Sequence, residues 1–136
     1  KEVSAKPGKL GNALKDNSMM QHRAAEASFT VEGSMLRIID GACRLQEQVE
    51  AGNLPTEAER AHYRWTLARS AQDAGMAITQ LFRAGGGRTA FTDSVLHRKF
   101  QDVTTGLNHA FLFADPIGTT FGAKLLGSEN PAEVPL

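Results

Sequence analysis

The sequence has 136 residues, and its 15 basic and 15 acidic side chains cancel to a formal net charge of zero. That balance gives no electrostatic reason to expect nucleic acid or an anionic membrane as a partner. The single cysteine, Cys43, excludes an internal disulfide and any multi-cysteine metal site. No apolar run approaches the roughly 20 residues of a membrane span and no signal-peptide core is present, so we expect a cytoplasmic protein.

Both ends of the sequence are predicted to lie outside the folded part. Residues 1–15 contain Pro7, Gly8 and Gly11 without a sustained hydrophobic period, which indicates a linker. Residues 128–136 contain two prolines and are predicted to form a tail. Because the first residue is Lys rather than Met, we expect this chain to be part of a longer polypeptide.

A first long helix is predicted from about Ser18 to Glu50, where Asp16, Asn17 or Ser18 can cap its start. Gly52 is predicted to end it, since glycine readily adopts the left-handed conformation. The expected buried stripe recurs at steps of three and four residues and consists of Met20, Ala24, Ala27, Val31, Met35, Ile38, Ala42, Leu45 and Val49.

A second helix is predicted from Thr56, which has Glu59 at the capping-box spacing, to about Arg83. Trp65 lies off its apolar stripe, which indicates either a second buried face or an indole lying flat on the surface. The expected stripe consists of Leu67, Ala71, Ala74, Ile78 and Leu81.

Three glycines at positions 85–87 stop the helical pattern, and a third helix is predicted from a cap at Thr92 or Asp93 to about Phe113. One side of this helix is apolar, with Leu96, Phe100, Val103, Leu107, Ala110 and Phe111. The opposite side, within a stripe roughly 60° wide at the helical period, carries Arg98, Asp102, Thr105 and His109. This polar stripe is either a solvated face with an ordinary surface ion pair or the lining of a site.

Asp115 followed by Pro116 predicts the cap and first position of a short last helix that ends at Gly127. No segment alternates as a strand would. The sequence therefore predicts an all-α protein of the up-down four-helix-bundle type over residues 16–127.

The sequence contains no motif of a common metal, nucleophile or phosphate site. The four histidines have no metal-ligand spacing, so we expect no metal. No Ser lies in a nucleophile turn, and the three glycines are not followed by the Lys-Ser or Lys-Thr of a phosphate-binding loop.

Several short runs, in order and spacing, resemble a known family. The runs FRAGGGRTAF, LHRKFQDV, NHAF and FGAKLLG, with the Asp115-Pro116 helix start, are similar to the C-terminal domain of the acyl-CoA dehydrogenase fold. More narrowly, they resemble its flavin-dependent monooxygenase branch, the oxygenase components of two-component hydroxylases. The run DNSMMQHRAAEA resembles the entry of that domain's second helix, so the first bundle helix is expected ahead of Lys1.

This resemblance implies roles for five residues. Gly85 and Gly86 match a glycine turn that lets the backbone approach a flavin, FAD or FMN, of a neighbouring subunit. Arg98 and Asp102 match an Arg–Asp pair near the cofactor. His109 matches a histidine that faces the flavin C4a region and the substrate, where it hydrogen-bonds a peroxide or takes a proton.

The implied activity is the hydroxylation of a small substrate, for which we expect an aromatic compound, through a C4a-hydroperoxyflavin. The resemblance also implies a homotetramer and a separate flavin reductase as partners, and an isolated fragment without activity.

Departures from dehydrogenases favour the oxygenase branch. The run FADPIGTTFG lacks the catalytic Glu of their Glu-Gly-Thr turn, and Phe82 and Arg83 stand where a Gln is usual. Two alternatives stay open: the C-terminal domain of an acyl-CoA dehydrogenase or oxidase, and a non-catalytic all-α interaction domain.

Overall fold

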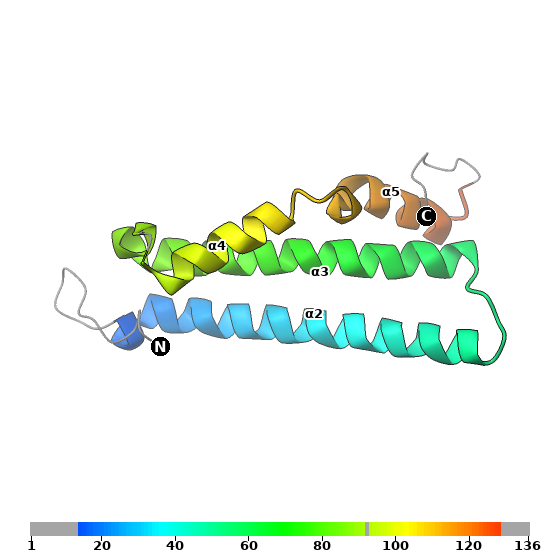
Figure 1. The fold of residues 1–136 in the computed structure, drawn as a ribbon, viewed down its shortest axis with the longest axis horizontal. Helices are drawn as coiled ribbons and strands as arrows, with labels where there is room; N and C mark the ends of the chain where they lie inside the picture. The colour runs from blue at the N-terminus through cyan, green and yellow to red at the C-terminus, as the bar shows by residue number, and fades with distance from the viewer. Residues whose placement is uncertain (1–13, 92, 129–136) are drawn as a thin grey trace. The chain divides into compact units, whose positions relative to one another are not determined.

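The structure, a computed structural model, describes residues 14–91 and 93–128, and these residues form helices joined by turns (Figure 1). The predicted linker up to residue 13, a cap at Thr92 and the tail from residue 129 lie outside this description. The prediction of an all-α chain is confirmed within it. The elements in chain order are η1 (Leu14–Asp16), α2 (Ser18–Glu50), α3 (Glu57–Ala84), η2 (Gly86–Ala90), α4 (Val95–Gly106), η3 (Ala110–Leu112) and α5 (Ala114–Leu125).

The two long helices begin and end as their sequences predict. The Asn17 side-chain oxygen accepts a hydrogen bond from the Met20 N–H at 3.1 Å, which caps α2. Gly52 follows the helix with a φ of 78°, in the left-handed region. At the start of α3, the Thr56 hydroxyl accepts from the Glu59 N–H at 3.3 Å, and the Glu59 carboxylate accepts from the Thr56 N–H at 2.7 Å. This reciprocal pair confirms the capping box.

The prediction for the third helix was wrong at both ends. Ser94 caps it, because its hydroxyl accepts from the His97 N–H at 3.4 Å. The helix α4 ends at Gly106, and the chain enters the separate turn η3, for which His109 is the N-cap. Glycine weakens a helix by roughly 1 kcal/mol relative to Ala, and the His109 ring competes for a backbone N–H. His109 therefore does not lie on the helix that carries Arg98 and Asp102.

The start of the last helix also differs from the prediction. α5 begins at Ala114 with Phe113 as its N-cap, and Phe113 makes no side-chain capping bond. Asp115 is not the cap, although it lies in the first turn, where a carboxylate interacts favourably with the helix dipole. Pro116 also lies in that turn, where its missing N–H costs no intrahelical bond.

The chain divides into two compact units, each with segments of both long helices. The first unit covers residues 1–32 and 73–107, and the second covers 33–72 and 108–136.

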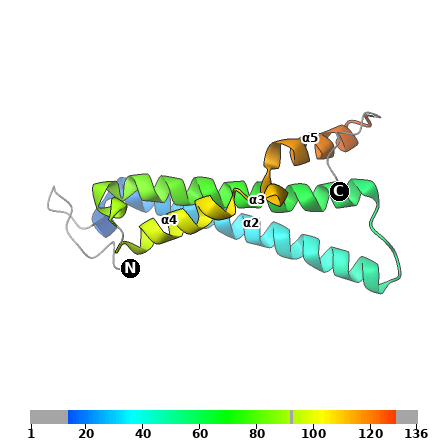
Figure 2. The ribbon, with the colours of Figure 1, turned by 45° about the horizontal axis from the view of Figure 1, so that its top comes forward.

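In the first unit, α4 lies along the second half of α3 (Figure 2). The rings of Phe82 and Phe100 stack with their centroids 4.5 Å apart. The Leu107 side chain lies against Gly75, at a position where any Cβ would collide with it. The predicted apolar side of α4 is confirmed as far as Leu107, since Leu96, Phe100, Val103 and Leu107 are half-buried.

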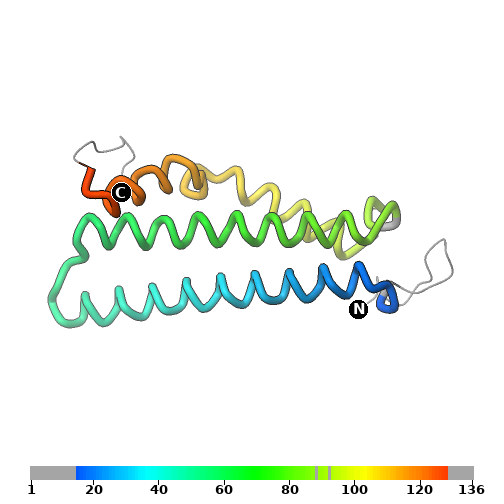
Figure 3. Tube along the Cα trace, turned by 180° about the vertical axis from the view of Figure 1, so that it is seen from behind, coloured from blue at the N-terminus to red at the C-terminus, as the bar shows by residue number. Residues whose placement is uncertain are grey.

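In the second unit, α5 packs on the first half of α3, the half next to the turn that joins α2 to α3 (Figure 3). Trp65 of α3 lies against Gly118 of α5, so the second buried face that its position suggested is confirmed. Ile117, the residue before Gly118, is only 2% exposed, and Ala61 and Ala68 of α3 are completely buried. The Lys124 ammonium donates to Glu57 at 2.7 Å at the edge of the unit.

The predicted buried stripe of α2 is confirmed at some positions and wrong at others. Ala27 is buried and Ile38 and Leu45 are half-buried, as predicted. Val31 is 43% exposed, Met35 52% and Val49 51%, and Ser34, which lay outside the predicted stripe, is buried. The side of α2 that is covered is thus rich in small residues, because small side chains let two helices approach closely. On α3, Leu67 is likewise exposed although it belonged to the predicted stripe.

The contact between Trp65 and Gly118 gives a test of this packing. A Cβ at position 118 would lie 2.6 Å from Cζ3 of Trp65, and a rigid indole cannot yield that space by rotating a terminal atom. We expect Gly118→Ala to lower the free energy of unfolding by about 1–3 kcal/mol, measured by urea denaturation followed by the fluorescence of Trp65.

Gly122 provides the matched control in the same helix. No atom lies within 4 Å of a Cβ at this position. Gly122→Ala should therefore stabilise the protein by about 0.5–1 kcal/mol through helix propensity alone. Equal effects of the two substitutions would contradict the packing.

Candidate functional site

The glycine turn after α3 combines a crowded glycine with an open one. Gly85 is buried, and its N–H donates to the Leu81 carbonyl at 3.0 Å. A Cβ at Gly85 would collide with Thr89. Gly86 has a φ of 68° and is exposed, and no atom lies within 4 Å of the place where its Cβ would be. The turn therefore needs glycine for packing at one position and for backbone conformation at the next.

Thr89 fixes the shape of this turn. It is 1% exposed, and its hydroxyl lies 2.9 Å from the Phe82 carbonyl oxygen and 2.6 Å from that of Gly86. The hydroxyl thus ties the end of α3 to the glycine that follows it. Sequence reasoning missed Thr89, because a single threonine in a short non-periodic segment gives no signal.

Arg98 and Asp102 lie on the exposed side of α4, as the sequence predicts. Within residues 14–91 and 93–128, no ion pair or hydrogen bond joins their side chains. The ion pair expected on a solvated face is therefore not formed, whereas the exposure of both side chains agrees with such a face and leaves both groups available to a ligand or another chain. Their assignment to a cofactor stays a prediction.

His109 lies at the turn between α4 and α5, and its ring is held by its own neighbours. The Phe111 N–H donates to its Nδ1 at 3.3 Å. The two rings also stack, with centroids 5.5 Å apart and planes inclined by 21°. His109 is exposed, so its other ring nitrogen is not enclosed by the described residues.

Two residues of α3 support this turn. The Arg64 guanidinium carbon lies 5.3 Å from the centroid of the Phe111 ring, a cation–π distance. The Gln72 amide donates to the Leu112 carbonyl at 3.3 Å. Neither residue carries a sequence signal, since their contacts are made to a segment some forty residues away.

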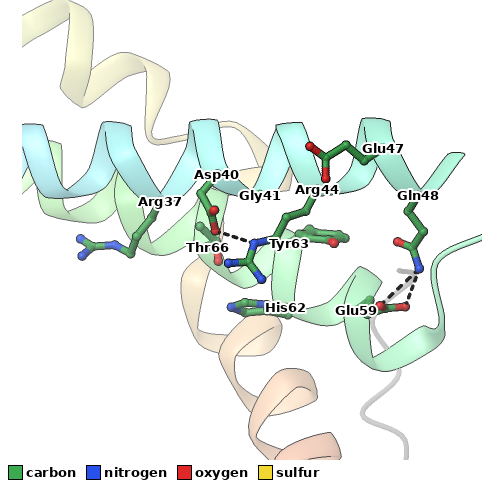
Figure 4. Close-up of a pocket in the computed structure, with 10 residues that line it drawn as sticks. All are labelled: Arg37, Asp40, Gly41, Arg44, Glu47, Gln48, Glu59, His62, Tyr63 and Thr66. Atoms are coloured by element: carbon green, nitrogen blue, oxygen red, sulfur yellow. Dashed lines mark hydrogen bonds and ion pairs between the residues drawn. The ribbon is translucent and has the colours of Figure 1, made fainter. Parts of the chain in front are cut away.

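A cleft of about 670 Å³ lies between α2 and α3 in the second unit (Figure 4). This volume falls in the range of small-molecule sites. None of the predicted site residues lines it. Its lining consists of Arg37, Asp40, Gly41, Arg44, Glu47, Gln48, Glu59, His62, Tyr63 and Thr66.

Most charges in this cleft are already engaged. Arg44 donates to Asp40 at 2.9 Å, and the Gln48 amide donates to Glu59 at 3.2 Å, as the dashed lines in Figure 4 mark. His62 stacks on the ring of Phe121 with centroids 5.1 Å apart. The cleft thus offers paired charges and ring faces, and its lining includes no serine or cysteine nucleophile.

Two kinds of feature are absent from the part of the chain that the structure describes. No cluster of three or more His, Cys, Asp or Glu side chains there is placed to hold a metal ion. No helix there is both long and apolar enough to cross a membrane.

The predicted site residues fall into two groups. Gly85, Gly86, Arg98 and Asp102 belong to the first compact unit, and His109 belongs to the second. Each group sits on an exposed turn or helix face of an all-α domain. Such surfaces are suited to binding against another domain or chain.

The comparison with protein families identifies this class of domain. Residues 3–113 match the family described as acyl-CoA dehydrogenase, C-terminal domain. The chain belongs to this family.

Relatives and solved structures agree with that membership. The chain is 28% identical over 116 residues to a pigment production hydroxylase of Rhodococcus erythropolis, across 85% of this chain and 29% of the relative. It is similar to the HsaA monooxygenase from M. tuberculosis, with a TM-score of 0.78 and 23% identity over 88% of this chain and 31% of that one. The 3-HSA hydroxylase from Rhodococcus sp. RHA1 gives a TM-score of 0.79 at 20% identity, over 89% and 32% of the two chains.

XiaF from Streptomyces sp., solved in complex with FADH2 and glycerol, gives a TM-score of 0.87 at 15% identity, over 98% of this chain and 34% of XiaF. At these identities the solved structures establish the fold. The chain spans about a third of the length of the proteins it resembles.

The capping box that begins α3 predicts a pH dependence of stability. The Thr56 N–H, then its hydroxyl and then the Gln48 amide hold the pKa of Glu59 below its ordinary value of 4.5. A lowered folded-state pKa stabilises the protein above the unfolded-state pKa, and this contribution is lost as the pH falls through the folded-state value. We expect Glu59→Gln to flatten the decline in unfolding free energy below about pH 4.5.

Chemical denaturation between pH 3 and 6 measures this slope. Glu47→Gln is the matched control for loss of charge, because Glu47 lines the same cleft and its carboxylate accepts no hydrogen bond from any residue that the structure describes. An unchanged slope in Glu59→Gln would contradict the assignment.

Proposed function

We propose that this chain is the C-terminal helical domain of a flavin-dependent monooxygenase that hydroxylates a small substrate, for which an aromatic compound is expected. The family membership over residues 3–113 and the hydroxylase relative support the class of enzyme. The structural observation that carries the proposal is His109, an exposed imidazole that is held by the backbone of its own turn.

The residues of the first unit fit a flavin bound at their surface. Gly86 presents bare backbone with open space around it, so that a phosphate or ribose can approach closely. Arg98 and Asp102 are exposed and have no partner in the described residues, so a guanidinium is available to a phosphate and a carboxylate to a hydroxyl. A reduced flavin held by these residues would supply oxygen-transfer chemistry with O2, and these residues would suit FAD or FMN alike.

The oxygenase assignment rests in part on the absence of a glutamate from residues 113–122. A dehydrogenase needs a carboxylate to remove a proton beside the thioester carbonyl, and residues 113–122 contain Asp115 but no Glu. Asp115 lies exposed in the first turn of α5.

Homotetramer formation and a separate flavin reductase are further parts of the proposal. Apolar side chains on the second-unit part of α2 support association, because Met35, Leu36, Ile39 and Val49 are each at least half exposed. A surface of this kind is usually covered by another chain or domain.

Flavin chemistry in the complete polypeptide tests the proposal. We expect it to bind FADH2 or FMNH2 and, on mixing with oxygen, to develop the absorbance of a C4a adduct before product appears. Reduction of bound oxidised flavin by an acyl-CoA would overturn the proposal in favour of a dehydrogenase or oxidase. Absence of any flavin binding would overturn it in favour of an interaction domain.

His109 gives the residue-level prediction. We expect His109→Ala to lower the rate of hydroxylation by about 10²–10⁴-fold while the circular dichroism spectrum is unchanged. His22→Ala is the matched control, because His22 is an exposed helical histidine whose Nε2 lies 3.4 Å from a carboxylate oxygen of Glu26 on the same helix. Equal turnover of the two variants would contradict a catalytic role for His109.

A further inference from the structure

We propose that Thr89 is a positioning residue for flavin binding: its buried hydroxyl holds the Gly86 backbone and the start of α4 in the arrangement that a flavin meets. This inference deepens the proposed function and rests on it for the identity of the ligand. Its structural content, the dependence of the turn on one hydroxyl, is measurable without a flavin.

The Thr89 hydroxyl connects the end of α3 to the turn that follows. The side-chain oxygen lies 2.9 Å from the Phe82 carbonyl oxygen and 2.6 Å from that of Gly86, in a residue that is 1% exposed. Phe82 belongs to the last four residues of α3, whose carbonyls have no N–H partner further along the helix. A hydroxyl has one proton, so the two carbonyls share a single donor.

Loss of this donor would favour a different turn. A carbonyl that is shielded from water and loses its donor destabilises the conformation that shields it. Gly86 has a φ of 68°, in the left-handed region, and glycine readily leaves that region when nothing holds it there. The hydroxyl of Thr89 therefore selects the one turn conformation in which the open backbone of Gly86 is presented outward.

The methyl group of Thr89 extends the same control to α4. A Cβ at Gly85 would collide with the Thr89 methyl carbon and would lie 3.5 Å from Cδ2 of Leu96 in α4. Both side chains thus lie over the bare backbone of Gly85, and η2 and α4 are in contact. Because α4 carries Arg98 and Asp102 on its exposed side, a change in the turn would displace these groups together with Gly86.

Thr79 provides the matched control in the same unit. Its hydroxyl also donates to a backbone carbonyl, that of Gly75 at 2.7 Å, but both residues belong to the regular part of α3. A hydroxyl bonded to the carbonyl four residues earlier adds little to a helix whose backbone bonds are already formed. Thr79→Val therefore removes a comparable hydroxyl without affecting the turn.

Hydrogen exchange of the complete polypeptide, followed by mass spectrometry of peptides that cover residues 85–90, tests the structural content. Thr89→Val keeps the shape of the side chain and removes the hydroxyl, whereas Thr89→Ser keeps the hydroxyl. We expect exchange in these peptides to accelerate about tenfold or more in Thr89→Val and to stay near the unaltered rate in Thr89→Ser and Thr79→Val. Unchanged exchange in Thr89→Val would overturn the proposal.

Anaerobic titration of the same variants with FADH2 and FMNH2 tests the role in binding. We expect Thr89→Val to raise the Kd of the reduced flavin about 10- to 100-fold, and Thr89→Ser and Thr79→Val to stay within about threefold of the unaltered protein. A merely structural threonine would lower the stability of Thr89→Val and leave this Kd unchanged, which would overturn the proposal. Equal losses of affinity in Thr89→Ser and Thr89→Val would overturn the role of the hydroxyl.

A second pair of variants decides the question if Thr89→Val does not fold. Thr89→Ala and Thr89→Ser both lack the methyl group and differ only in the hydroxyl, so a higher Kd in Thr89→Ala supports the proposal and an equal Kd overturns it. If the unaltered polypeptide binds neither reduced flavin, the proposed function and the flavin role of Thr89 fail together. The exchange measurement then still decides whether the hydroxyl holds the turn.

Discussion

Close approach of short helices to α3 is the constraint on which the rest of this structure depends. In the first unit α4 reaches α3 because Gly75 leaves room for Leu107, and in the second unit α5 reaches it because Gly118 leaves room for Trp65. Each contact places a large side chain where a Cβ would otherwise be. Interiors pack densely and tolerate little extra volume, so these two glycines decide where α4 and α5 lie on their respective segments of α3.

The candidate site residues occupy the connections that this packing positions. The glycine turn precedes α4 and is closed by the buried hydroxyl of Thr89, while the His109 turn precedes α5 and is held by Arg64 and Gln72. Both turns present backbone and side-chain groups outward from supported elements. In the proposed function, such turns would contribute fixed contacts to a cofactor or substrate.

The exposed apolar side of α2 fits the same interpretation. A helix normally buries its most apolar side, yet here the covered side carries Ala27 and Ser34, and side chains such as Leu36 remain largely exposed. Burying apolar area contributes about 25 cal/mol per Å², so association with another chain or domain has a substantial source of free energy on this surface. The cleft beside it is lined by charges that are mostly paired to one another.

The sequence by itself determined the helical class, the bounds of α2 and α3 and their caps, because these depend on local groups such as Asn17, Thr56, Glu59 and Gly52. Its order of motifs also indicated the family to which the chain belongs. Only the tertiary structure decided which side of α2 is covered, since that depends on how closely another helix can approach and not on apolar periodicity. It also showed that contacts with Arg64 and Gln72, distant in sequence, hold the turn that follows α4, although the local groups Gly106 and His109 already favour ending that helix.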